Sequence, residues 1–205
     1  MSNLYTVDQP AEDVALVFGV MNPVEVETPE ETRPGLKGLI VRKGERGRTV
    51  HSLTWGFPRR DRETGTLKPV NLVADLTNPM WSEMAQDPRY RCLIAVSAFA
   101  NPAGKRGAMT RTWFRLKREP VFAWAGFCRQ TKEWGAVFAG MTCDANPMIE
   151  PLNPRMPVIL RPHEHEDWLT CKIDRVIDLQ YRGHYPADEM EAIPTKDPWV
   201  QRRAV

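Results

Sequence analysis

Short runs of apolar and aromatic residues, separated by glycine, proline or charged residues, recur along most of the chain. Runs of this kind that are rich in Val, Ile, Phe and Trp are typical of β-strands. The pattern predicts strands at residues 38–42, 49–55, 91–96, 112–116, 121–127, 136–142 and 157–160. Because the segments 112–116 and 121–127 are close in sequence, they are predicted to form a hairpin, and antiparallel pairing should dominate.

Helices are predicted to be few and short. Residues 10–21 are predicted to be helical because Pro10 suits a first turn and acidic residues follow it. Asn78 and the proline after it form a cap and first-turn signal for a helix over 78–84. A third helix is predicted over 162–171, where proline again occupies the start.

The segments between and after these elements are polar. Residues 22–35 are rich in Pro, Glu and Thr and are expected to form an irregular connector. The tail at 186–205 is polar and spaced by prolines, so it is expected to lie on the surface or to fray. Together the pattern predicts an α+β fold, with a mainly antiparallel, barrel-like β-sheet core and a few short helices.

Length and composition fit one globular domain over residues 1–205. The chain is 42% hydrophobic and holds seven tryptophans, which is enough to build a packed core. No apolar run is long enough to span a membrane, and the first residues lack the pattern of a secretion signal. The four cysteines show no CxxC spacing, so buried reduced thiols in a cytoplasmic protein, bacterial or phage-encoded, are expected.

The net charge of +2 conceals a strong segregation of charge along the sequence. Residues 8–31 hold seven acidic and no basic residues, whereas 33–68 hold ten basic and three acidic ones. Residues 105–118 add six basic residues and no acid. If both basic segments share one face, they form a surface for a polyanion such as a nucleic acid. The alternative is a set of solvated hairpins with scattered charges.

No metal site and no cofactor are expected from the residue pattern. His163 and His165 are two positions apart, and on a helix such residues point in different directions. The chain has no glycine-rich phosphate loop, no GxSxG elbow and no convincing Cys/His pair. His51 and His184 stand alone and are expected to be structural or exposed.

Six segments follow, in order, the motifs of one known family. Residues 1–5 are similar to M-C-N-L-Y, residues 55–58 to W-G-x-x-P, and residues 71–75 to N-x-R-x-E. Residues 91–101 are similar to R-C-L-[IV]-P-x-x-x-F-x-E, and residues 120–126 to P-x-x-F-A-G. Residues 142–160 are similar to T-x-x-A-N…P-[IL]-H-x-R-M-P-V-I-L. On these motifs the chain resembles the SOS response-associated peptidase (SRAP) family, as a divergent member with substituted catalytic positions.

The resemblance implies chemistry at the N-terminus. In the family, removal of the first methionine exposes a cysteine whose α-amine and thiol condense with the ring-opened aldehyde of an abasic site. The product is a thiazolidine cross-link to single-stranded DNA. An asparagine orients the reacting groups, a glutamate takes part in proton transfer, and a histidine assists ring opening and reversal.

At the four matching positions this chain has Ser2, Asn71, Asn101 and Asn153, which are our candidate catalytic residues. Only Asn71 keeps the family residue. Ser2 replaces the cysteine with a poorer nucleophile, while Asn101 and Asn153 replace the glutamate and the histidine. Asparagine keeps hydrogen-bonding capacity but does not titrate, so the covalent chemistry is expected to be lost or altered.

The candidate DNA-binding residues are Trp55, Arg59, Arg60 and Arg155, because phosphate neutralisation and base stacking require only arginines and aromatic faces. The resulting hypothesis is an SRAP-like protein of the DNA-damage (SOS) response that binds single-stranded DNA without cross-linking to it. Two alternatives remain open. One is an enzyme or lyase that forms an imine with abasic DNA through the Ser2 amine. The other is a phage-related interaction protein.

Overall fold

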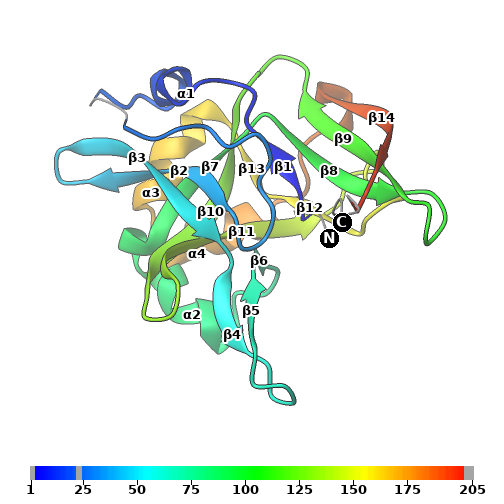
Figure 1. Ribbon diagram of the computed structural model, residues 1–205. Helices are drawn as coiled ribbons and strands as arrows, with labels where there is room; N and C mark the ends of the chain where they lie inside the picture. The colour runs from blue at the N-terminus through cyan, green and yellow to red at the C-terminus, as the bar shows by residue number, and fades with distance from the viewer. Residues whose placement is uncertain (1–2, 22–24, 201–205) are drawn as a thin grey trace.

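The structure is a computed structural model that describes residues 3–21 and 25–200 (Figure 1). The strands are β1 Tyr5–Thr6, β2 Lys37–Gly44, β3 Gly47–Trp55, β4 Phe57–Arg60, β5 Leu67–Val70, β6 Leu72–Val73, β7 Arg91–Val96, β8 Ala98–Ala103, β9 Thr110–Leu116, β10 Phe122–Thr131, β11 Gly135–Asp144, β12 Arg155–Pro157, β13 Ile159–Leu160 and β14 Met190–Pro198. The helices are α1 Ala11–Val17, α2 Pro79–Gln86, α3 His165–Thr170 and α4 Ile173–Tyr181, with short 3-10 turns η1 Pro88–Tyr90, η2 Pro162–Glu164 and η3 Ala187–Glu189.

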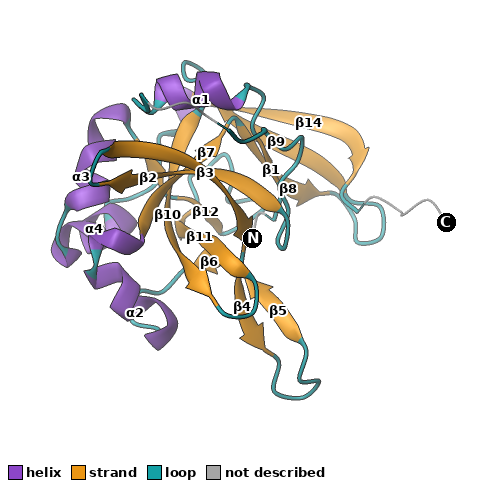
Figure 2. Cartoon of the chain, turned by 60° about the vertical axis from the view of Figure 1, so that its left-hand side comes forward, coloured by secondary structure: helices purple, strands orange, loops and turns teal. Residues whose placement is uncertain are grey.

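Five strands close into a barrel. Strands β11, β3, β2, β7 and β10 pair in that order, and β10 pairs back with β11. All of these pairs are antiparallel except β3 with β11, which run parallel at Thr54↔Val137. Figure 2 shows these strands curving around a common centre, with α2, α3 and α4 on one side. The predicted α+β fold with a barrel-like, mainly antiparallel sheet is therefore confirmed.

Three aromatic rings fill the barrel. Tyr5 enters from β1, and its ring lies 5.1 Å from that of Trp55 and 6.2 Å from that of Trp124, both edge-on. All three side chains are fully or almost fully buried. Glycine at position 140 makes room for the Trp124 ring, because a Cβ at Gly140 would collide with it. The aromatic cluster thus fixes β1 to the barrel.

A second sheet, in the order β1-β8-β9-β14, stands beside the barrel. One prediction about it was wrong. The segments predicted as a hairpin do not pair, since β9 bonds to β8 and β14, whereas β10 bonds to β7, β11 and β13. The tail was expected to lie on the surface or to fray, and Met190–Pro198 does lie at the surface, but as an ordered edge strand along β9. Its last residues, 201–205, lie outside the described range.

The helix predictions were correct in place, and only the first was too long. The predicted 10–21 helix ends at Val17. Asn78 caps α2 as expected, because its side-chain oxygen accepts a hydrogen bond from the Met80 N–H over 3.0 Å. The predicted helix at 162–171 is η2 followed by α3, and α4 was not predicted at all. No helix in the described residues is long and apolar enough to cross a membrane.

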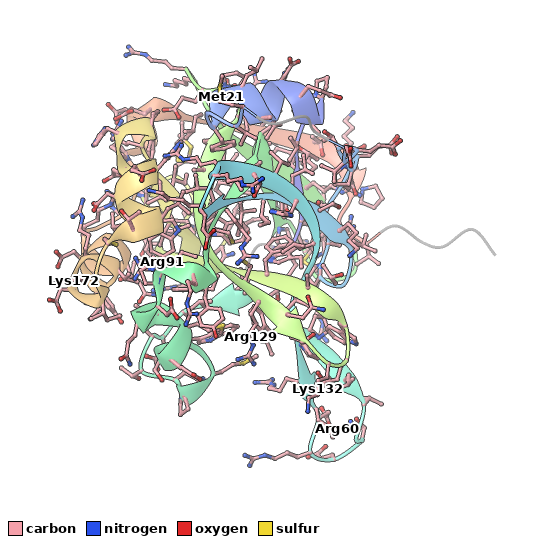
Figure 3. The ribbon with its side chains drawn as sticks, turned by 90° about the vertical axis from the view of Figure 1, so that its left-hand side faces the viewer. Met21, Arg60, Arg91, Arg129, Lys132 and Lys172 are labelled. Carbon is pink, nitrogen blue, oxygen red and sulfur yellow. The ribbon has the colours of Figure 1, made fainter. Side chains whose placement is uncertain are left out.

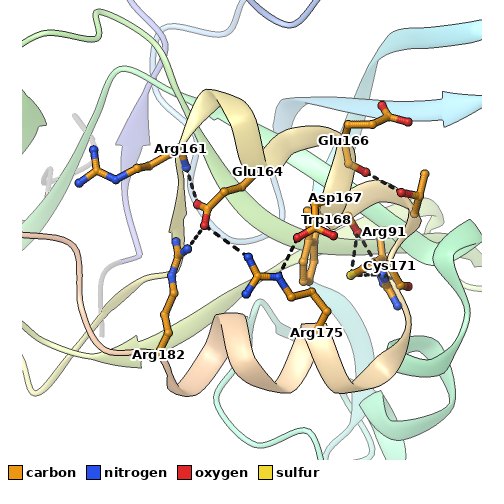
Figure 4. Close-up of polar contacts among 10 residues, drawn as sticks. Arg91, Arg161, Glu164, Glu166, Asp167, Trp168, Cys171, Arg175 and Arg182 are labelled. Atoms are coloured by element: carbon orange, nitrogen blue, oxygen red, sulfur yellow. Dashed lines mark hydrogen bonds and ion pairs between the residues drawn. The ribbon is translucent and has the colours of Figure 1, made fainter.

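A buried carboxylate ties the last two helices to the barrel (Figure 4). Glu164 accepts from the Arg161 backbone N–H at 2.8 Å and from the Arg182 guanidinium, and Arg175 lies 3.8 Å away. Burial acts to raise the pKa of Glu164, but the hydrogen bonds from Arg182 and Arg161 outweigh it and leave the pKa below its usual value. Glu164 is therefore a structural ion-pair centre, which accounts for one member of the run that contains His163 and His165.

All four cysteines are free thiols. Cys92, Cys128 and Cys143 are buried, as expected, and burial raises the pKa of Cys143 to about 11. Cys171 departs from the expectation because it is only half-buried, with its sulfur 2.9 Å from Arg91 Nη1.

Candidate functional site

Two asparagine pairs lie at the positions that sequence motifs single out. Asn71 donates from Nδ2 to Asn3 Oδ1 over 3.0 Å. Asn153 donates from Nδ2 to Asn101 Oδ1 over 2.8 Å. The backbone joins the pairs, because the Ala100 N–H donates to the Leu4 carbonyl at 2.9 Å, and Asn101 and Asn3 are the next residues along each segment. The structure therefore brings Asn71, Asn101 and Asn153 into one region.

The barrel holds Asn71 in place through its backbone. Its carbonyl oxygen accepts from the Trp55 indole N–H at 3.0 Å and from the Gly140 N–H at 3.0 Å. Asn71 follows directly on β5, so the β4–β5 hairpin leads into the site. Asn3 was missed as a site residue. The only available signal was its place beside Ser2 in the N-terminal motif.

The hydrogen bonds fix which way the buried amides point. Asn153 Oδ1 accepts from the Arg155 backbone N–H at 3.1 Å, so its Nδ2 must face Asn101. Asn101 Oδ1 accepts that bond, and its own Nδ2 is buried without a hydrogen-bond partner. Asn101 and Asn153 are 0% and 2% exposed. The pair is therefore a neutral, oriented hydrogen-bonding unit, with neither an acid nor a base.

Ser2, the expected position of the nucleophile, lies outside the described residues. Asn3 is exposed and bonded to Asn71, while Leu4 and Tyr5 are fully buried. The chain thus passes from a fixed, buried strand to the surface directly beside the asparagine pairs.

Trp55 was expected to stack on DNA bases, and the structure corrects this prediction. Its side chain is 0% exposed and is enclosed by Tyr5, Trp124 and Phe138. A base cannot reach a ring that is packed on all sides. Trp55 instead supports the site from beneath, through its indole hydrogen bond to Asn71.

The three candidate arginines differ in their availability. Arg59 and Arg60 are exposed on β4, and Figure 3 shows Arg60 on the projecting hairpin, away from the helices. Arg155 is only partly exposed. Its guanidinium bonds to Asp144 Oδ1 and to the Thr142 carbonyl, each at 2.5 Å. Arg155 therefore has a protein carboxylate as its partner, whereas Arg59 and Arg60 are exposed and Arg60 donates to the Gly65 carbonyl at 2.7 Å.

Within residues 3–21 and 25–200, no group of three His, Cys, Asp or Glu side chains converges as metal ligands would. His165 is buried, and burial first and Arg48 second lower its pKa to about 4. Neighbouring Glu164 is occupied by Arg182, and Glu166 by Lys43 and Arg48. These contacts give the His163–Asp167 run a structural role.

Solved structures share this architecture. A protein from Bordetella bronchiseptica has a TM-score of 0.78 at 22% identity, over 94% of this chain and 99% of its own. A protein from Bacteroides thetaiotaomicron has a TM-score of 0.75 at 19% identity, over 93% and 90%. A phage-related protein from B. bronchiseptica has a TM-score of 0.71 at 15% identity, over 95% and 94%. The chain is thus an α+β protein of a recurrent barrel-centred fold.

The family model described as SOS response associated peptidase (SRAP) matches residues 1–198. This protein belongs to the SRAP family, as the six motifs predicted. The search of curated proteins gave no match.

Proposed function

We propose that this SRAP protein binds single-stranded DNA non-covalently, with the covalent chemistry of the family lost. The observation that carries the proposal is the continuity between an exposed basic hairpin and the asparagine pairs. Arg59, Arg60 and Arg62 are exposed on the hairpin that β4 and β5 form, and β5 runs directly into Asn71. Positive side chains on a projecting ribbon neutralise backbone phosphates without any catalytic group.

The asparagine pairs support the loss of chemistry. Formation and reversal of an abasic-site adduct need groups that take up and release protons. Asn101 and Asn153 provide only amide donors and acceptors, and they are joined by one hydrogen bond of 2.8 Å. Asn71, which is the family residue at its position, is held by two hydrogen bonds to its carbonyl oxygen, one from the Trp55 indole and one from the Gly140 N–H. The site thus keeps its hydrogen-bonding groups and has no titrating group at positions 101 and 153.

The test combines binding and trapping. Protein with its native N-terminus is titrated into a labelled single-stranded oligonucleotide at several salt concentrations, with and without one abasic site. We expect affinity that falls steeply with salt, and no adduct that survives denaturing electrophoresis. Absence of salt-sensitive binding contradicts the proposal. An adduct trapped by borohydride would support the imine-forming alternative instead.

A further inference from the structure

The barrel has an open mouth on the side where β2 ends and β3 begins. A cavity of about 270 Å³ lies there, with walls that include Arg42, His51, Leu53, Cys128 and Gln130. Side chains alternate along a strand, so residues two apart face the same side. Arg42 is two past the buried Ile40, and His51 pairs with Ile40 in the ladder. The cavity is therefore an extension of the barrel interior, separate from the asparagine pairs.

The principal charge in this mouth is Arg42. One guanidinium nitrogen, Nη2, donates to the Arg89 carbonyl at 3.2 Å, and its Nε is buried without a partner. Among the described residues Arg42 forms no ion pair. The charge of Arg42 acts on the other lining residues. The pKa of His51 is lowered, first by burial and second by the charge of Arg42. A half-buried cation without a counter-charge is unfavourable unless an anion joins it.

Other donors surround the same space. His51 Nε2 lies 2.8 Å from Thr49 Oγ1, so the opposite ring nitrogen is the one that can meet a ligand. The Gln130 amide and Tyr90 also line the cavity, and none of the lining residues is a carboxylate. Arg129, labelled in Figure 3, stands at the rim with its guanidinium over the Phe57 ring at 5.6 Å. The mouth is thus rich in donors and positive in charge.

We propose that the barrel mouth binds a small oxyanion of the phosphate class through Arg42. The cavity lies just below the range of about 300–1,000 Å³ that is typical of pockets for drug-sized ligands, which favours a smaller guest. Mouths of β-barrels are common ligand sites. A guanidinium fork with an unused N–H binds oxyanions by charge-assisted hydrogen bonds. The proposal does not depend on binding of single-stranded DNA.

The test measures binding of inorganic phosphate by calorimetry, against chloride at matched ionic strength. We expect saturable binding by the unaltered protein. Arg42→Gln should weaken it about tenfold or more, equivalent to about 1.4 kcal/mol. The control is Arg115→Gln, which removes an exposed arginine paired with Glu191 on the other sheet. Backbone amide shifts on phosphate addition should concentrate at Leu53, Gln130 and Ala136.

A second variant and a second ligand complete the design. If Arg42→Gln does not fold, His51→Gln provides the readout, since His51 is only half-buried. Oligonucleotides with and without a 5′-phosphate distinguish free phosphate from a nucleic-acid end as the source of the group. Binding no stronger than that of chloride overturns the proposal. So does equal weakening by the Arg42 and Arg115 variants.

Discussion

Asn153 donates its side-chain amide to the side-chain oxygen of Asn101, across 2.8 Å and between segments 52 residues apart in sequence. The bond joins β8 of one sheet to the turn before β12 of the other. It therefore links the two sheets through a pair of buried, neutral side chains.

We expect this bond to be measurable as a coupling energy. Asn101→Ala, Asn153→Ala and the double variant form a cycle, and each single change leaves a buried partner unsatisfied. The cost of each should be about 1–3 kcal/mol in the free energy of unfolding, from denaturant titration. The double variant should cost less than the sum by about 1 kcal/mol. Simple additivity would mean that the two amides do not stabilise each other.

The exposed hairpin should dominate DNA binding. We expect Arg59→Gln combined with Arg60→Gln to weaken binding of single-stranded DNA and to lower the slope of log affinity against log salt by about 1.4, for two lost phosphate contacts. Fluorescence anisotropy at several salt concentrations gives both values.

The matched control for the hairpin removes two charges elsewhere. Arg89 and Lys172 are exposed on the side of the helices, and Figure 3 labels Lys172 there. Arg89→Gln with Lys172→Gln should leave the salt slope unchanged. If both double variants lower it equally, binding follows net charge and not the hairpin.

Gly140 should tolerate no side chain. Alanine there places a methyl group against the buried Trp124 ring, which is held by its own hydrogen bond to the Met141 carbonyl at 2.6 Å. We expect Gly140→Ala to lower the free energy of unfolding by about 3 kcal/mol or more. Gly44→Ala is the control, since the nearest atom to its new Cβ is 3.7 Å away. Comparable losses for both would contradict tight packing inside the barrel.

The buried carboxylate of Glu164 should matter more than its exposed neighbour. Glu164→Ala leaves Arg182 without its carboxylate partner, and we expect a loss of about 3–5 kcal/mol in unfolding free energy. Glu166 pairs with Lys43 and Arg48 at the surface, so Glu166→Ala should cost about 1 kcal/mol or less. Thermal and denaturant unfolding of the two variants, side by side, would show whether this ranking is reversed.

His165 should make the fold sensitive to acid. Its pKa is lowered to about 4 in the native state, below the ordinary value of 6.5, so the unfolded chain binds a proton before the native chain does. Stability should therefore be complete above about pH 6.5 and fall as the pH drops toward 4, by at most about 1.4 kcal/mol per pH unit.

The half-buried His51 contributes in the same direction, so the difference between variants isolates His165. Unfolding free energies measured from pH 7 to 4 should show a shallower pH dependence for His165→Gln. A slope that is the same with and without His165 would disprove its role.

Local signals predicted the elements that carry them, and non-local pairing decided the rest. Asn78 and Pro79 predict the start of α2, because the hydrogen bond to the Asn78 cap lies within the first turn of that helix. The α4 helix begins at Ile173, and Lys172 before it forms no side-chain cap, although Val176 and Leu179 have the spacing of a buried face. The sequence of β14 is polar because β14 is an edge strand, so it was predicted to be a tail. Its partner β9 lies far upstream, and local sequence gives no sign of the pairing.

The site was predictable by position and not by environment. The motifs supplied Asn71, Asn101 and Asn153 as candidates, and the structure brings them into one region. They gave no indication that Trp55 is enclosed, because a tryptophan beside a glycine suits a buried core and an exposed platform equally well. The sequence likewise did not predict the partner of Arg155. Asp144 lies opposite it on β11, and local sequence does not specify the pairing of β11 with β12.

The single parallel pair of the barrel has a consequence for the order of folding. Thr54 and Val137 meet across it although 83 positions separate them, whereas β2 with β3 and β10 with β11 are local hairpins. Local hairpins form quickly, but a contact of this span must first overcome a large loss of chain entropy. The ring therefore closes last along this seam. Until it does, the edges of β3 and β11 stay open to pairing with other chains, which makes the nascent protein most prone to aggregation at that stage.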